Sequence, residues 1–240
     1  MSSRPVLVMI GISSTLVACG ALIGIQDIGV DPARPARDAG PLFEGGEAGE
    51  PADAVPVEDS AADAGTPPPV IVDASTPSRR VFLRSTATNG SIGGLAGADT
   101  LCRSAASGLG GTWVAWVSGE GMNAIDRIDF PGPYVTVNHV LVALTKTDLL
   151  TAPLEHLINV KEDGTELMSD KPWVWTGTLR NGTASYNCNN WTTGNGAIPG
   201  VAGSFDQASN QKWTQNDGEA PFVATFNCGT LAHLYCFELN

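Results

Sequence analysis

The chain has 240 residues, of which 13 are basic and 25 are acidic, and a net charge of −12. The acidic excess lies mainly in residues 19–78, which hold 11 acidic and 2 basic side chains, whereas residues 79–240 hold 14 and 10. Because no basic stripe is present to neutralise phosphates, this composition argues against a nucleic-acid-binding protein.

The first segment has the pattern of an export signal. Arg4 precedes an apolar run over residues 6–17, the order of charge and hydrophobicity found in secretory signal peptides. The run ends in Leu16-Val17-Ala18-Cys19, which resembles a bacterial lipobox. The resemblance implies cleavage before Cys19 and acylation of that cysteine.

We therefore expect residues 1–18 to be a lipoprotein signal peptide and the mature chain to be anchored to a membrane through lipid on Cys19. Gly20 rather than Asp follows the cysteine, which favours the outer membrane or the cell surface. Two alternatives stay open. The apolar stretch over residues 5–25 is long enough for an uncleaved membrane anchor, which needs about 20 residues, and the chain could also be simply secreted.

Residues 19–78 are predicted to be a disordered acidic tether. Residues 31–78 contain nine of the sixteen prolines, and Ala, Asp, Glu and Gly make up most of the remainder. Such a composition buries too little apolar surface to offset the conformational entropy of the chain. The segment is expected to be either a spacer or a linker of no selected length.

Residues 79–240 have the pattern of one α+β domain. A strand is predicted at 81–83, followed by a helix over 98–107 whose apolar positions, three or four apart, share one face. A short helix is predicted at 124–128, and short strands at 113–117, 134–137, 140–143, 173–177, 222–226 and 233–237. We expect an antiparallel sheet with one main helix and a loop-rich middle.

Four cysteines remain once Cys19 is assigned to lipid: Cys102, Cys188, Cys228 and Cys236. An even number in an exported chain predicts disulfides, and three pairings are possible in principle. A zinc site is the alternative, but the sequence has no CxxC or HxxxH spacing to support it.

Three stretches of the sequence together resemble a known pattern. They are Gly93-Gly94-Leu95-Ala96-Gly97-Ala98-Asp99 before Cys102, Cys188-Asn189-Asn190-Trp191-Thr192, and the closing run from Cys228 to Glu238. Together they resemble a bacterial surface-protein family whose fold is C-type-lectin-like, or endostatin-like, over residues 80–238. The resemblance implies the pairs Cys102–Cys236 and Cys188–Cys228, the second closing a long loop over residues 189–227.

That loop contains the candidate ligand-binding residues, which are Asn190, Trp191, Trp213, Asn216 and Asp217. Oxygen atoms of Asn216, Asp217 and Glu219 are candidate ligands for Ca²⁺, a hard cation. However, the chain lacks the Glu-Pro-Asn, Gln-Pro-Asp and Trp-Asn-Asp motifs of calcium-dependent sugar-binding lectins. Trp191 and Trp213 are also typical of core residues beneath a long loop, and Asn and Asp are typical of turns.

No catalytic motif is present: there is no G-x-S-x-G nucleophile elbow, and the glycines near residue 93 are not followed by the Lys-Ser/Thr of a phosphate loop. We therefore expect a non-enzymatic binding or adhesion module, displayed at the cell surface, with an extracellular glycan or protein as its ligand. Two alternatives stay open, namely a structural envelope protein without a specific ligand and an enzyme with an unrecognised site.

Overall fold

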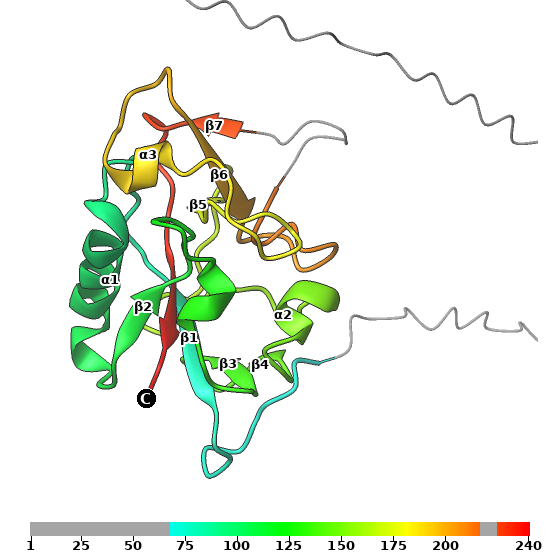
Figure 1. Cartoon of the computed structure of the whole chain (residues 1–240). Coiled ribbons are helices and arrows are strands. Elements are labelled where there is room, and N and C mark those ends of the chain that lie inside the picture. The colour runs from blue at the N-terminus through cyan, green and yellow to red at the C-terminus, as the bar shows by residue number, and fades with distance from the viewer. Residues whose placement is uncertain (1–67, 217–224) are drawn as a thin grey trace, which may run out of the picture. The chain divides into compact units, whose positions relative to one another are not determined.

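A computed structural model describes residues 68–216 and 225–240. Cys19, Asp217 and Glu219, on which the lipid and calcium predictions depend, lie outside these ranges. The described residues form an α+β fold with two sheets and few helices (Figure 1). None of the helices in these ranges has the length and apolar character needed to traverse a bilayer.

The larger sheet has five strands in the order β2-β8-β1-β3-β4. Their bounds are β1 Arg79–Leu83, β2 Trp113–Ala115, β3 Tyr134–Thr136, β4 Leu141–Ala143 and β8 Tyr235–Glu238. The last strand, β8, lies between β2 and β1 and is antiparallel to both. The expected antiparallel sheet is corrected in one place, because β1 and β3 pair in parallel and make this sheet mixed.

The smaller sheet has the antiparallel order β5-β6-β7, formed by Trp173–Trp175, Pro199–Ser204 and Thr225–Asn227. It is joined to the larger sheet just before β8, where the His233 amide donates to Trp173 O at 2.9 Å and the Trp175 amide donates to His233 O at 3.0 Å. Both β6 and β7 lie between Cys188 and Cys228, so the segment between these cysteines contains strands as well as loops.

The main helix is α1, Gly94–Ala105, which continues into the 3₁₀ turn η1, Ala106–Gly108. Its buried side includes Leu95, Ala98 and Cys102, the face predicted from their spacing. The helix begins four residues earlier than predicted, because Gly93 adopts a left-handed φ of 86° and starts the first turn. A Cβ at Gly97 would clash with the carbonyl oxygen of Ile92, so this turn also requires glycine.

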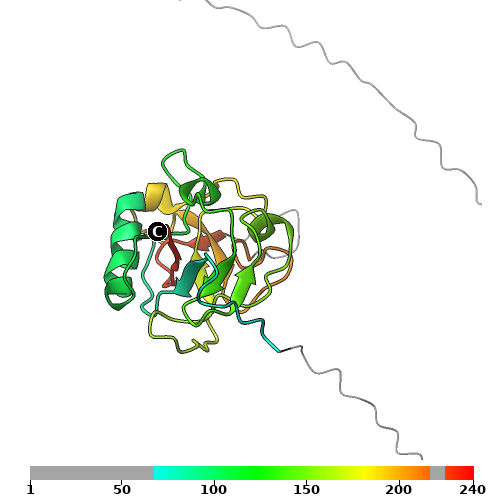
Figure 2. The ribbon, with the colours of Figure 1, turned by 90° about the horizontal axis from the view of Figure 1, so that it is seen from below.

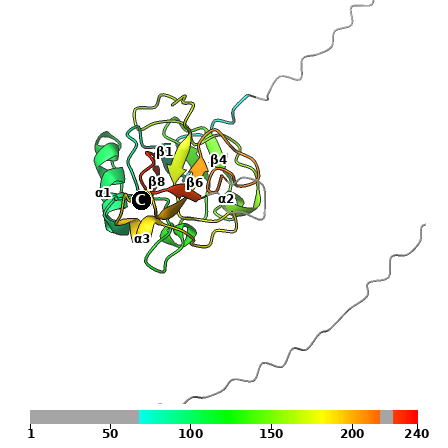
Figure 3. The same cartoon turned by 90° about the horizontal axis from the view of Figure 1, so that it is seen from above.

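The remaining helical segments are short: η2 covers Ala124–Arg127, α2 covers Asp148–Thr151 and α3 covers Cys188–Trp191. The views in Figures 2 and 3 show α1 on one side of the larger sheet and α2 on the other. An ion pair ties α1 to η2, since Arg127 Nη2 lies 2.6 Å from Asp99 Oδ1, which also accepts the amide of Ala115 at 3.0 Å.

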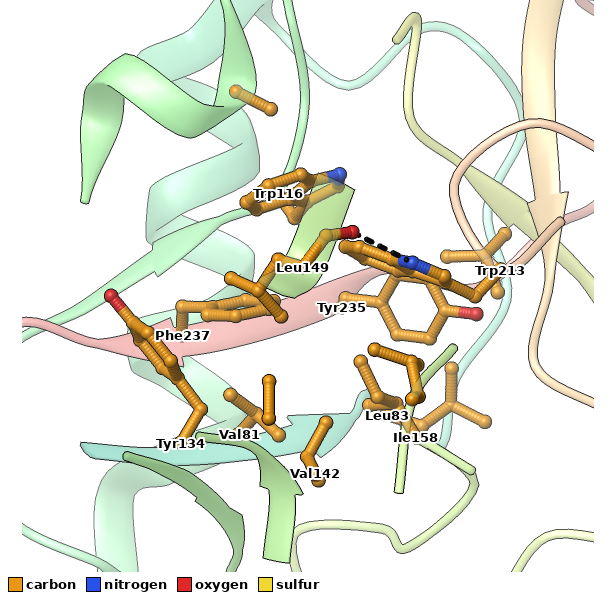
Figure 4. Close-up of a cluster of buried hydrophobic side chains, with 14 of the residues drawn as sticks. Val81, Leu83, Trp116, Tyr134, Val142, Leu149, Ile158, Trp213, Tyr235 and Phe237 are labelled. Atoms are coloured by element: carbon orange, nitrogen blue, oxygen red, sulfur yellow. Dashed lines mark hydrogen bonds between the residues drawn. The ribbon is translucent and has the colours of Figure 1, made fainter. Parts of the chain in front are cut away.

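Alternation along the strands fills a core on each face of the larger sheet. Val81, Leu83, Tyr235 and Phe237 belong to one cluster, while Phe82 between the first two belongs to the other. Figure 4 shows the first cluster, in which Trp213 and Trp116 complete the packing. Five buried indole N–H groups donate within the fold, those of Trp113, Trp116, Trp175, Trp191 and Trp213.

Two disulfides link distant parts of this core, in the pairing that the resemblance implies. Cys102–Cys236 joins α1 to β8, and Cys188–Cys228 joins α3 to the residue after β7. All four cysteines are fully buried.

Backbone pairing begins upstream of the boundary expected at Arg79. Ile71 forms an isolated bridge with Val140, and the amide of Leu141 donates to Val70 O at 2.8 Å. Val70 and Ile71 are apolar residues in a stretch rich in Pro, Ala and Asp, and their pairing extends the edge of the sheet at β4.

Candidate functional site

The two tryptophans predicted to contact a ligand are core residues. Trp191 and Trp213 are both 0 % exposed. The indole N–H of Trp191 donates to Ser118 O at 2.9 Å, and that of Trp213 donates to Leu149 O at 3.2 Å (Figure 4). A buried indole with a satisfied N–H offers no face to a ligand, so the core interpretation holds for both residues.

Asn190 bonds through its side chain to other parts of the domain, whereas Asn216 bonds through its main-chain amide. Asn190 is exposed, and its Oδ1 accepts the amide of Glu120 at 2.9 Å and the side-chain amide of Asn187 at 3.1 Å. The amide of Asn216 donates to Ala202 O at 2.9 Å. Within the described ranges, no group of three or more His, Cys, Asp or Glu side chains is arranged to hold a metal ion.

The segment around Asn190 has a rare backbone conformation. Cys188, Asn189, Asn190 and Trp191 have φ values of 54°, 54°, 53° and 62°, so α3 is one turn of left-handed helix. Each non-glycine residue in this region costs roughly 1 kcal/mol or more, although Asn tolerates it better than other residues. Runs of such strain persist only where the surroundings enforce them, and they concentrate at functional sites.

Three features enforce the left-handed turn. Cys188 is bonded to Cys228, the Trp191 side chain is buried in the core, and the Asn187 Oδ1 accepts the amide of Asn190 at 3.0 Å. Glycine permits close packing against the disulfide, since a Cβ at Gly200 would lie 2.7 Å from the Cys188 sulfur. The turn is thus fixed before any ligand binds.

An open groove of about 720 Å³ lies against this turn. Its lining comprises Ser185, Tyr186, Asn187, Asn189, Thr193, Asn195, Ile198 and Pro199. A smaller hollow of about 180 Å³ shares Ile198 and Pro199 with the groove and is also lined by Thr225–Asn227 of β7.

The groove presents one exposed aromatic ring among amides and hydroxyls. Tyr186 is 55 % exposed, although most large apolar side chains of the domain are buried. No Asp, Glu, Lys, Arg or His side chain contributes to the lining. Among the described residues, the Tyr186 hydroxyl and the Asn195 side-chain nitrogen have no protein hydrogen-bond partner, so both are open to a ligand.

This chemistry suits a neutral, polar ligand with a partly apolar face. Amides and hydroxyls both donate and accept hydrogen bonds, and an exposed ring provides a flat apolar surface.

Sequence reasoning located the loop but missed the central residue of the groove. Asn189, Asn190 and Asn195 fall within the loop predicted to bind a ligand, whereas Tyr186 precedes Cys188 and lies outside that loop. The useful signal was a single Tyr among Ser, Asn and Thr residues beside a disulfide, because an aromatic side chain in so polar a stretch has few apolar neighbours to cover it.

No protein-family model matches the chain, and no curated protein matches it.

Proposed function

We propose that the chain is a surface-displayed binding module whose groove at Tyr186 binds a neutral glycan. The observation that carries the proposal is a preformed groove with an exposed tyrosine, uncharged hydrogen-bonding side chains and a backbone held in a strained turn by a disulfide. The apolar C–H face of a pyranose would stack on the ring, and its hydroxyls would bond to the amides and hydroxyls around it.

A ligand larger than one sugar residue could contact both hollows, because Ile198 and Pro199 line each of them. The two hollows that share Ile198 and Pro199 measure about 720 and about 180 Å³. An oligosaccharide would occupy the larger hollow and reach toward β7 across the smaller one.

The display part of the proposal is supported by the N-terminal sequence and the disulfides. The lipobox-like Leu16–Cys19 and the acidic, proline-rich tether that follows suit a lipid-anchored protein of the outer membrane or cell surface. The two disulfides suit a protein that folds in an oxidising compartment.

The segment leading into β1 lies at one end of the domain, and α3 and β7, whose residues line the two hollows, lie at the opposite end (Figure 1).

The fold proposed for the domain is C-type-lectin-like. The α+β architecture, a helix tied by disulfide to the last strand and a second disulfide closing the later region all suit it. Fold-level likeness carries little functional information, so the glycan proposal rests on the groove.

A glycan array probed with the oxidised, full-length protein tests the function. We expect binding to neutral oligosaccharides that does not require Ca²⁺, strong loss of binding for Tyr186→Ala, and partial retention for Tyr186→Phe, which keeps the ring. Leu231→Ala is the matched control, since Leu231 is 64 % exposed but does not line either hollow. Unchanged binding by Tyr186→Ala, or no glycan binding at all, would refute the proposal and favour a structural envelope protein.

The anchor is tested separately by mass spectrometry of the protein recovered from its native membrane. We expect residue 19 to be the first residue of the mature chain and to carry acyl groups. An intact N-terminus would instead support the uncleaved membrane anchor.

A further inference from the structure

A separate hollow of about 200 Å³ lies beside the hairpin in which Val160 pairs with Glu166. It is lined by Leu157, Asn159, Leu167, Met168, Ser169, Phe205 and Asp206. None of these residues lines the glycan groove or its extension. The hollow is therefore a site separate from the groove.

Asn159 in the wall of this hollow has an unsatisfied acceptor. The residue is 4 % exposed, and its Oδ1 is buried with no hydrogen-bond partner among the described residues. The other end of the carboxamide makes only a long bond, 3.5 Å from Nδ2 to Glu166 Oε2. A buried acceptor without a partner is destabilising unless something else supplies the donor.

Asp206 adds a negative charge to the same hollow. Its carboxylate is oriented by Ser204, whose hydroxyl donates to Oδ1 at 2.5 Å, and the residue itself is exposed. Burial and the charge of Asp206 both raise the pKa of Tyr235, so that the buried phenol stays neutral. An exposed carboxylate at this hollow would attract a ligand that carries a positive charge.

The other walls are apolar. Leu157 and Leu167 are half-buried, Phe205 is 2 % exposed, and Met168 is 82 % exposed. Met is unbranched and flexible, so Met168 can cover a ligand without a change in the backbone. An occupant must thus combine an apolar body with hydrogen-bond donors.

We propose that this hollow binds a primary alkylammonium group, such as the end of a lysine side chain. The three donors of the ammonium would satisfy the Asp206 carboxylate and the Asn159 carboxamide oxygen. The methylene chain would pack on the two leucines, Met168 and Phe205. The volume is that of roughly six or seven water molecules at about 30 Å³ each, which suits a chain of four or five carbons.

Ligand-observed NMR titration of the oxidised, full-length protein with n-butylammonium tests the site. n-Butanol and butyrate are the matched probes, since they keep the alkyl chain and remove or reverse the charge. We expect butylammonium to bind at least about tenfold more tightly than butanol, the factor expected for one charge-assisted hydrogen bond. Butyrate should not bind.

Asp206→Asn should remove this preference, whereas Asp163→Asn should not. Asp163 is an exposed carboxylate of the same hairpin and does not line the hollow. Because Asn159→Leu alters a buried position, its unfolding midpoint must be checked, and Met168→Ala provides a second variant on the exposed rim.

Equal binding of butylammonium and butanol, retention of the preference in Asp206→Asn, or a soaked crystal that holds only water in the hollow would overturn the proposal. None of these outcomes bears on the glycan groove, since the two sites share no residue. If butylammonium binds as expected, a comparison of peptides with and without lysine, and of free amines, would distinguish a protein ligand from a small molecule.

Discussion

Removing the two disulfides separately tests how the domain is stabilised. The alanine variants are C102A/C236A for the outer bond and C188A/C228A for the inner bond, with sequence separations of 134 and 40 residues. In the chain-entropy model these loops correspond to about 5.0 and about 3.9 kcal/mol. Because the inner loop is nested in the outer one, its closure shortens the outer loop to roughly 94 residues and lowers the outer contribution to about 4.7 kcal/mol.

The inner bond also holds the left-handed turn at Cys188–Trp191. Breaking it lets these residues relax toward ordinary backbone angles, which offsets roughly 1–2 kcal/mol of the entropic loss. We therefore expect C188A/C228A to lose about 2–3 kcal/mol in free energy of unfolding, and C102A/C236A to lose about twice as much.

Urea denaturation followed by tryptophan fluorescence measures both values, because buried indoles lie on both faces of the larger sheet. The slope of the unfolding free energy against urea must be compared along with the midpoint, since opening a loop expands the unfolded chain and raises that slope. If C188A/C228A proves the more destabilised variant, loop length does not govern these disulfides. A loss below about 1 kcal/mol for both would mean that the core alone holds the fold.

Two further predictions concern the core and its pH dependence. Trp213→Phe should lower the free energy of unfolding by about 2–4 kcal/mol, because it opens a small cavity and leaves the Leu149 carbonyl without its donor; a change below about 1 kcal/mol in urea denaturation would contradict this role. Burial lowers the pKa of His233 from 6.5, so the unfolded chain takes up more protons as the pH falls through 6.5, and stability should be full above this pH and decrease below it. His233→Gln should flatten that decrease in urea titrations repeated at successive pH values, and an unchanged slope would assign the effect to other groups.

Much of the fold could be predicted because apolar runs and spacing are local properties. The strand at Val81–Leu83 follows from a short run of apolar residues. The face of α1 that includes Leu95, Ala98 and Cys102 follows from a period of 3.6 residues. The α+β class and the disulfide pairing are likewise confirmed.

The features that were missed depend on contacts between distant residues. β6 has the sequence Pro199-Gly200-Val201-Ala202-Gly203-Ser204, which lacks both alternation and β-branched residues apart from one Val, and it forms a strand because β5 and β7 supply partners on both sides. The parallel pairing of β1 with β3 depends on the path of the chain between them and has no local signal.

The candidate site illustrates the same limit. Asn189 and Asn190 are typical turn residues, and their composition gives no indication of four consecutive left-handed residues. That conformation is enforced by Cys228 and by the core around Trp191, both supplied by other parts of the fold. Tyr186 becomes notable only once its exposure is known.

The position of β8 bears on how fast the domain folds. β8 lies between β1 and β2 and carries Cys236, which is 134 residues from its partner Cys102 in α1. Bringing such distant segments together costs chain entropy before the new contacts compensate for it. The larger sheet is therefore expected to close late, and the domain to fold more slowly than one whose strands pair with their neighbours in sequence.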